Sequence, residues 1–240
     1  MVDAYLFSLI IISVAFVPSL YYLVVARNWE RYGKEPYRRL LMCFAYGAIA
    51  AIIISIILEI LILGNLHRID RIYELGDDNF LGAVVVAPIV EESVKAFGLV
   101  LVLAYILREE DGMIYGIGIG LGFAATENLL YELSALNVGL DAYLATAILR
   151  TITSTILHAT ATGVTGLGVG RAVMRKKPLL FALPFLLIAI AMHAVFNFIA
   201  SLNTTYPDLF GEFTCVVTFM LLLIFASYAW SSVRRRISAS

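Results

Sequence analysis

Glu91, Glu92 and Lys95 are ionisable residues inside a long apolar run. A charged side chain at the centre of a bilayer-spanning helix costs roughly 2.5–3.5 kcal/mol, so residues of this kind usually serve a function. Lys95 follows the two glutamates at helical spacings of four and three residues, so it can reach either carboxylate. The neighbouring glutamates point about 100° apart around a helix. We therefore expect one of them to do chemistry and the other to support it.

Polar residues also interrupt three other apolar runs: Glu127 with Asn128, then His158, then His193 with Asn197. A buried carboxylate in a wet cavity can take a proton from water, and a second acid–base group can protonate a leaving amine. An imidazole and an amide four residues apart share a helix face and can donate to an oxyanion. These parts predict hydrolysis of a peptide bond. Neither Gly-Xaa-Ser-Xaa-Gly nor His-Glu-Xaa-Xaa-His occurs in the chain.

The composition indicates which elements must position these residues. The chain has 240 residues, of which 61% are hydrophobic and 15% charged, whereas a soluble domain is about 45–50% apolar and about 25% charged. We predict an all-α fold, a polytopic transmembrane helix bundle in which residues 1–240 form one membrane-embedded domain. About seven spans are expected, at 3–26, 40–63, 80–107, 113–133, 142–170, 179–202 and 212–233. The glycines within 116–122 and 163–170 predict close packing of two helices.

The distribution of lysine and arginine predicts the orientation. With seven spans, 13 of these residues lie on the side that holds the C-terminus, and only Arg68 and Arg71 lie on the other. Because cytoplasmic loops carry the excess of positive charge, we expect the N-terminus outside and the C-terminus in the cytoplasm of a multi-pass protein of the cell membrane. Arg150 lies within a span, where we expect it to pair with Glu132 or Asp141.

Four motifs occur in order on four apolar runs: Glu91-Glu92-Xaa-Xaa-Lys95, Phe123-Xaa-Xaa-Xaa-Glu127-Asn128, His158, and His193-Xaa-Xaa-Xaa-Asn197. Together they resemble the PrsW family of membrane proteases, which is related to the CAAX prenyl endopeptidases and the bacteriocin-processing proteases. The early segment 31–36 is also similar to one in that family. The resemblance implies a glutamate-dependent intramembrane protease in which Glu91 activates water and His193 with Asn197 forms the oxyanion site. Where those relatives carry a histidine in the second motif, this chain has Glu127.

The resemblance also implies a partner. The best-known activity of the family is the first cleavage of a membrane-bound anti-sigma factor in regulated proteolysis. The expected partners are therefore a single-span membrane protein and the lipid bilayer, with no nucleic acid. We expect the catalytic residues to be Glu91, Glu92, Glu127, His158, His193 and Asn197, with Lys95 and Asn128 supporting them.

Other interpretations use the same residues. Carboxylates and histidines within spans also form proton relays, so a proton- or ion-coupled transporter is the alternative function. The charged residues could instead be an ion cluster that locks helices together, or part of a non-catalytic scaffold. Two glutamates and two histidines could bind zinc. We expect no metal or other cofactor, because the Lys95 ammonium competes with a cation for the carboxylates.

Overall fold

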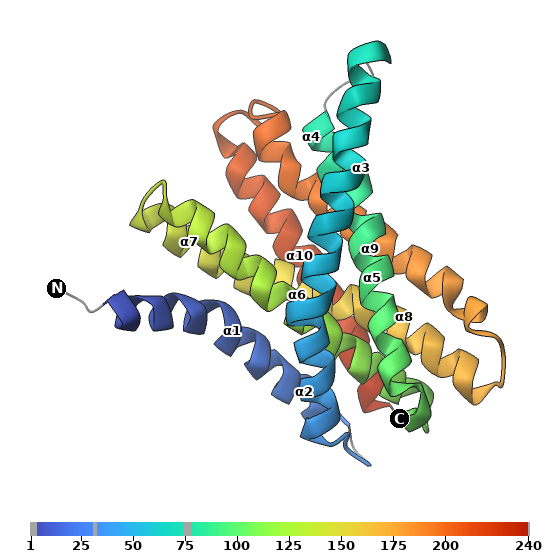
Figure 1. Ribbon diagram of the computed structural model, residues 1–240. Helices are drawn as coiled ribbons and strands as arrows, with labels where there is room; N and C mark the ends of the chain where they lie inside the picture. Colours follow the sequence, from blue (N-terminus) through green and yellow to red (C-terminus); the bar gives the residue numbers. More distant parts are fainter. Residues whose placement is uncertain (1–3, 31–32, 74–77, 240) are drawn as a thin grey trace.

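The computed structural model describes the backbone of residues 4–30, 33–73 and 78–239, and all of their side chains except those of residues 4, 66–73 and 78–79. These residues form helices and no strand, which confirms the all-α prediction (Figure 1). The α-helices are α1 (Ala4–Asn28), α2 (Tyr37–Ala45), α3 (Ile52–Tyr73), α4 (Asp78–Leu81), α5 (Ala87–Gly98), α6 (Glu109–Leu136), α7 (Leu140–Ile152), α8 (Ser154–Met174), α9 (Leu183–Thr205) and α10 (Thr214–Ser238).

Shorter helical segments join several of these helices. The π-helical turns η1 (Tyr46–Ala51) and η2 (Gly82–Val86) lead into α3 and α5, and the 3₁₀ turns are η3 (Leu99–Tyr105), η4 (Leu179–Ala182) and η5 (Gly211–Phe213). Pro88 at the start of α5 gives a physical reason for η2, because proline has no N–H to donate to the preceding turn. In a π turn the Ala83 carbonyl accepts from the N–H five residues later, which is position 88. Because residue 88 is proline, the Ala83 carbonyl is free for another donor.

Five helices in the described part of the chain are long and apolar enough to cross a membrane: Tyr5–Asn28, Tyr37–Asn65, Glu109–Leu136, Leu179–Thr205 and Gly211–Ser238. They match five of the seven expected spans. The expected span at 80–107 is helical, but Glu91, Glu92 and Lys95 give it three charges. The described part of the chain is therefore an all-helical bundle with five candidate membrane spans.

The expected span at 142–170 is helical but is not one continuous helix, because the structure divides it at Thr153 into α7 and α8. Thr153 leaves the helical conformation, with φ −123° and ψ −68°. Its hydroxyl donates to the Leu149 carbonyl at 2.6 Å, and the Thr155 hydroxyl donates to the Arg150 carbonyl at 3.2 Å. Threonine hydroxyls that bond to preceding carbonyls bend helices, and apolar composition alone does not reveal such a bend.

Helices α6 and α8 lie side by side at the centre of the bundle (Figure 1). A Cβ atom on Gly116 would lie 2.3 Å from the Thr162 carbonyl oxygen, and one on Gly120 would lie 2.1 Å from that of His158. Only glycine permits this approach, so the prediction of close glycine-mediated packing is confirmed. The contact brings the polar residues of the two helices within bonding distance.

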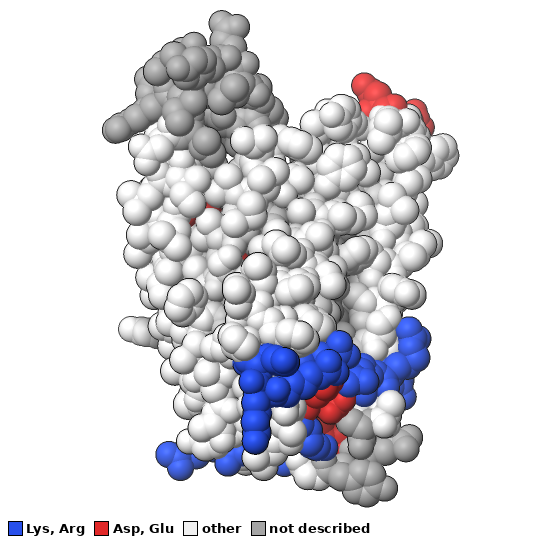
Figure 2. All heavy atoms as spheres, turned by 90° about the vertical axis from the view of Figure 1, so that its right-hand side faces the viewer, with Lys and Arg blue, Asp and Glu red and all other residues white. Residues whose placement is uncertain are grey.

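Charged residues gather at one end of the bundle, below a wall that carries almost no charge on the face shown (Figure 2). Glu109 at the start of α6 accepts from Arg171 of α8 at 2.9 Å and from Arg236 of α10 at 3.1 Å. Arg236 also pairs with Glu110 at 2.9 Å. These ion pairs tie together the ends of three helices.

Candidate active site

Lys95 lies at the centre of the polar cluster and is completely buried. Its ammonium donates to Glu91 Oε2 at 3.1 Å and to Glu92 Oε1 at 2.8 Å, so it reaches both carboxylates as the spacing predicted. The ammonium also lies 3.9 Å from the centre of the Phe123 ring, within cation–π range. The negative charge of Glu91 and Glu92 is thus compensated mainly by Lys95 of the same helix, α5.

His158 connects α5 to α6. Its Nδ1 lies 2.8 Å from Lys95 Nζ, and its Nε2 lies 2.7 Å from Glu127 Oε2. An ammonium can only donate, so Nδ1 accepts, and the proton of a neutral imidazole is on Nε2, which donates to Glu127. This network assigns the His158 tautomer and links Lys95 to the carboxylate of α6.

The two neighbouring glutamates have different surroundings. Glu92 is fully buried, and its carboxylate accepts from Lys95, from Thr162 Oγ1 at 3.2 Å and from His193 Nδ1 at 3.1 Å. Glu91 is 6% exposed, and its Oε1 receives no hydrogen bond from any residue that the structure describes. Glu92 is therefore held in place on all sides, whereas Glu91 keeps one oxygen available.

Glu91 opens into a cavity of about 610 Å³, which we call the cleft. Its walls come from α3, η2, α5, α6, α7, α8 and α9, and the site residues that line it are Glu91, Glu127, His158 and Asn197. His193 lies behind this lining, with its ring centre 4.9 Å from that of His158. Residues from four helices thus meet around one cavity, as their types and spacing predicted.

Asn197 makes a contact that the sequence did not indicate. Its Nδ2 donates to the Ala83 carbonyl of η2 at 2.8 Å. That carbonyl lacks a partner because Pro88 has no N–H, so Asn197 supplies the missing donor and attaches α9 to η2. One amide N–H of Asn197 is thereby committed, and the second remains for a ligand in the cleft.

The expected pairing of Arg150 with Glu132 or Asp141 is wrong. Arg150 of α7 donates to Glu127 Oε2 at 2.7 Å, to Asn128 Oδ1 at 2.8 Å and to Ser154 Oγ at 3.0 Å. Asn128 in turn donates to Thr155 Oγ1 at 2.8 Å. Arg150 stands just before the bend at Thr153, which the expected straight span did not include. The signal for this contact in the sequence was the positive charge of Arg150 within an apolar run.

Two further residues of the cleft were missed. Ser55 and Glu59 of α3 line it opposite the polar cluster. Glu59 is an acidic residue within the candidate span Tyr37–Asn65. That isolated charge was the signal that could have drawn attention to it.

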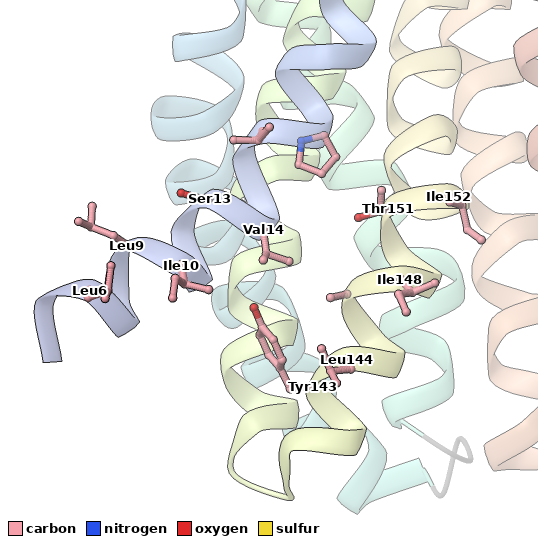
Figure 3. Close-up of a pocket in the computed structure, with 13 residues that line it drawn as sticks. Leu6, Leu9, Ile10, Ser13, Val14, Tyr143, Leu144, Ile148, Thr151 and Ile152 are labelled. Atoms are coloured by element: carbon pink, nitrogen blue, oxygen red, sulfur yellow. The ribbon is translucent and has the colours of Figure 1, made fainter. Parts of the chain in front are cut away.

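A larger cavity, of about 770 Å³, lies between α1 and α7 (Figure 3). Its lining is almost entirely aliphatic, with Ser13, Tyr143 and Thr151 as its polar residues. This lining offers no acid–base pair for hydrolysis. The chemistry of the molecule therefore belongs to the cleft.

The helical bundle and its buried carboxylate–histidine cluster define the class of an integral membrane protease. The model of the family described as "PrsW family intramembrane metalloprotease" matches residues 35–227. This chain belongs to the PrsW family of intramembrane proteases.

Three relatives that are each named Protease PrsW support this assignment. Protease PrsW of Clostridioides difficile (strain 630) is 31% identical over 201 residues, which are 77% of this chain and 76% of the relative. Protease PrsW of Bacillus subtilis (strain 168) is 29% identical over 124 residues, 50% of this chain and 53% of the relative. Protease PrsW of Shouchella clausii (strain KSM-K16) is 32% identical over 119 residues, 48% of this chain and 49% of the relative. No solved structure matches the chain significantly.

The family description names a metalloprotease. Three side chains of the polar cluster are candidate metal ligands. Glu91, His158 and His193 each place one ligand atom within 4.8 Å of the others. However, both nitrogens of His158 are engaged, one by Lys95 and the other by Glu127. The Lys95 ammonium also bonds Glu91, so it already provides a positive charge to two of the three donors. A metal does not fit this arrangement unless Lys95 moves away.

Proposed function

We propose that this protein hydrolyses a peptide bond of a single-span membrane protein, with Glu91 as the general base. The observation that carries the proposal is the asymmetry of the glutamate pair. Glu91 offers one unbonded oxygen to the cleft while its other oxygen is held by Lys95. Glu92 has no such opening.

In this mechanism, a water molecule in the cleft loses a proton to Glu91 as its oxygen attacks the carbonyl carbon of the substrate. The resulting oxyanion accepts a hydrogen bond from Asn197 through its uncommitted N–H, while His193, whose Nδ1 donates to Glu92, holds the second glutamate in place behind the cleft. The proton held by Glu91 then passes to the leaving amine as the C–N bond breaks, which returns Glu91 to its carboxylate form. Lys95 holds Glu91 in position throughout.

His158 and Glu127 have a different role in the proposed mechanism. Their hydrogen bond connects the cleft wall to Lys95, and Arg150 holds Glu127 on its other side. We propose that this chain of charges orients the base and compensates the charge that develops near it. Glu127 lines the cleft and its bonds to Arg150 and His158 use Oε2, so we assign its other oxygen to hold the attacking water.

We also propose that the hydrolysis uses no resident metal. The support is the position of the Lys95 ammonium among Glu91, Glu92 and His158. This contact assigns the balancing positive charge to a side chain of the protein itself.

The proposed setting is the cell membrane, with about seven spans, the N-terminus outside and the C-terminus in the cytoplasm. The gathering of basic side chains at one end of the molecule supports this orientation (Figure 2). A buried core that draws residues from α1, α2, α6, α8 and α10 supports one domain for the whole chain. A membrane-bound anti-sigma factor is the first substrate to test.

The test uses purified protein in liposomes with a single-span substrate tagged at both ends. We expect Glu91→Gln to abolish cleavage and Glu212→Gln, a matched change at an exposed residue that does not line the cleft, to leave it intact. Cleavage that persists in Glu91→Gln would rule out this mechanism. Proton flux through the same liposomes, retained without any cleavage by the unmodified protein, would favour the transporter instead.

A further inference from the structure

The wall of the cleft formed by α3 carries two polar residues for which the mechanism has no use. Ser55 and Glu59 are four residues apart, so they lie on one face of α3, and both line the cleft together with Glu91. Ser55 is 1% exposed. Its hydroxyl oxygen and Oε1 of Glu59 are buried and have no hydrogen-bond partner in the described part of the chain.

Unpartnered groups of this kind are costly in a membrane protein. A buried polar atom without a partner costs about 1–3 kcal/mol, and a charged one costs more. Because Glu59 lies within a candidate membrane span, a partner for these atoms must enter through the cleft. Two such atoms on one helix face, both directed into the cavity that holds the proposed base, indicate a ligand that supplies the missing donors.

The charges around the cleft determine what kind of ligand fits. Among the described residues, the basic side chain that lines the cleft, Arg150, is already bonded to Glu127, and the buried Lys95 is bonded to Glu91, Glu92 and His158. Glu59 therefore adds a carboxylate that no basic side chain of the described residues neutralises. An acidic ligand would be repelled by Glu59, Glu91 and Glu127, whereas a cationic one would be attracted.

The remaining lining of this wall suits a long cationic side chain. Ile52, Ile56 and Leu63 of α3 flank the two polar residues in the cleft. Lysine and arginine bury their methylene stems on apolar surfaces and keep their charged ends with polar partners. Isoleucine and leucine side chains beside a carboxylate and a hydroxyl offer both kinds of contact.

We propose that Ser55 and Glu59 form a substrate subsite that binds a lysine or arginine side chain close to the scissile bond. This inference rests on the proposed proteolytic function and adds a substrate preference to it. Glu59 pairs with the cationic group, and the Ser55 hydroxyl accepts one of its hydrogen bonds. Neither residue takes part in the bond-breaking steps.

The experiment uses the full-length protein in liposomes and a single-span substrate whose cleavage site is first mapped by mass spectrometry. Matched substrates then carry Lys, Met or Glu at each of the three positions on either side of that site. We expect the Lys substrate at one position to be cleaved about tenfold faster than the Met substrate, and the Glu substrate slowest. Equal rates for Lys, Met and Glu at every position would overturn the proposal.

Variants of α3 then test whether these residues cause the preference. Glu59→Gln should bring the ratio of the Lys to the Met cleavage rate close to one, through a raised KM for the Lys substrate, and Glu59→Lys should favour the Glu substrate. Ser55→Ala should weaken the preference by only a few-fold. Equal slowing of all substrates by Glu59→Gln would overturn the subsite, since it would indicate a structural or acid–base role.

The outcomes separate the two proposals. If Glu91→Gln is inactive and Glu59→Gln keeps the preference for Lys, the subsite is wrong and the proposed mechanism stands. If Glu91→Gln still cleaves, the proposed mechanism fails, whatever Glu59 does. Glu212→Gln is the control for loss of a carboxylate elsewhere in the molecule.

Discussion

Lys95 of α5 donates a hydrogen bond of 2.8 Å to Nδ1 of His158 on α8. This bond joins two polar groups that the sequence places 63 residues apart. It also defines the tautomer of the histidine, because the ammonium leaves only the opposite nitrogen to donate to Glu127. Helices α5, α6 and α8 therefore share one network of ionic contacts and hydrogen bonds.

Replacement of Lys95 by methionine removes the positive charge at similar length. We expect the variant to be inactive and less stable, because Glu91 and Glu92 lose their common partner, and breaking a buried ion pair costs about 3–5 kcal/mol. Cleavage rate and thermal unfolding in detergent measure the two effects. Activity within twofold of the unmodified protein would show that the ammonium is dispensable.

Arg150→Gln removes the cation that holds Glu127 in the cleft. We expect activity to fall by about 10- to 100-fold, as is typical when a partner that orients a functional group is lost. Because the two side chains act as a pair, the double variant with Glu127→Gln should be little worse than the poorer single variant. Additive losses in this double-mutant cycle would show that the residues act independently.

Asn197→Ala leaves the Ala83 carbonyl without its donor. We expect a modest loss of stability, of about 0.5–1.5 kcal/mol for one lost hydrogen bond, together with reduced activity. The double variant Asn197→Ala with Pro88→Ala tests the cause, since an alanine in place of the proline restores a backbone N–H near Ala83. Thermal unfolding that shows no recovery in the double variant would argue against this account of the π turn.

Gly120→Leu tests the close contact between α6 and α8. A Cβ at this position would lie 2.1 Å from the His158 carbonyl oxygen, so the helices must separate, and we expect little folded protein. Gly64→Ala is the control, because nothing lies within 4 Å of a Cβ added there. Fluorescence-detected size-exclusion chromatography of both variants measures the outcome, and a normal profile for Gly120→Leu would contradict the packing.

Chelator treatment tests the proposal that no metal takes part. We expect protein washed with a strong chelator to keep its activity and to contain no stoichiometric transition metal by mass spectrometry. The physical reason is the Lys95 ammonium, which already bonds two of the three candidate ligands. Activity that is lost on chelation and restored by added zinc would show that Lys95 moves away and that a metal binds in its position.

The sequence by itself was sufficient for the class of protein and for most of the candidate site. Ionisable residues are so costly in apolar helices that their presence marks a functional cavity. Helical spacing then predicts local pairs such as Lys95 with Glu91 and Glu92, because neighbours three and four residues apart must lie close together.

Only the tertiary structure decided the relationships between helices. It separated Glu91, which opens into the cleft, from Glu92, and it placed Arg150, just before the bend at Thr153, on Glu127. It also brought Glu59 of α3 to the same cavity. Contacts of this kind depend on the rotation, depth and bending of each helix, which packing sets and which a one-dimensional pattern of polarity does not contain.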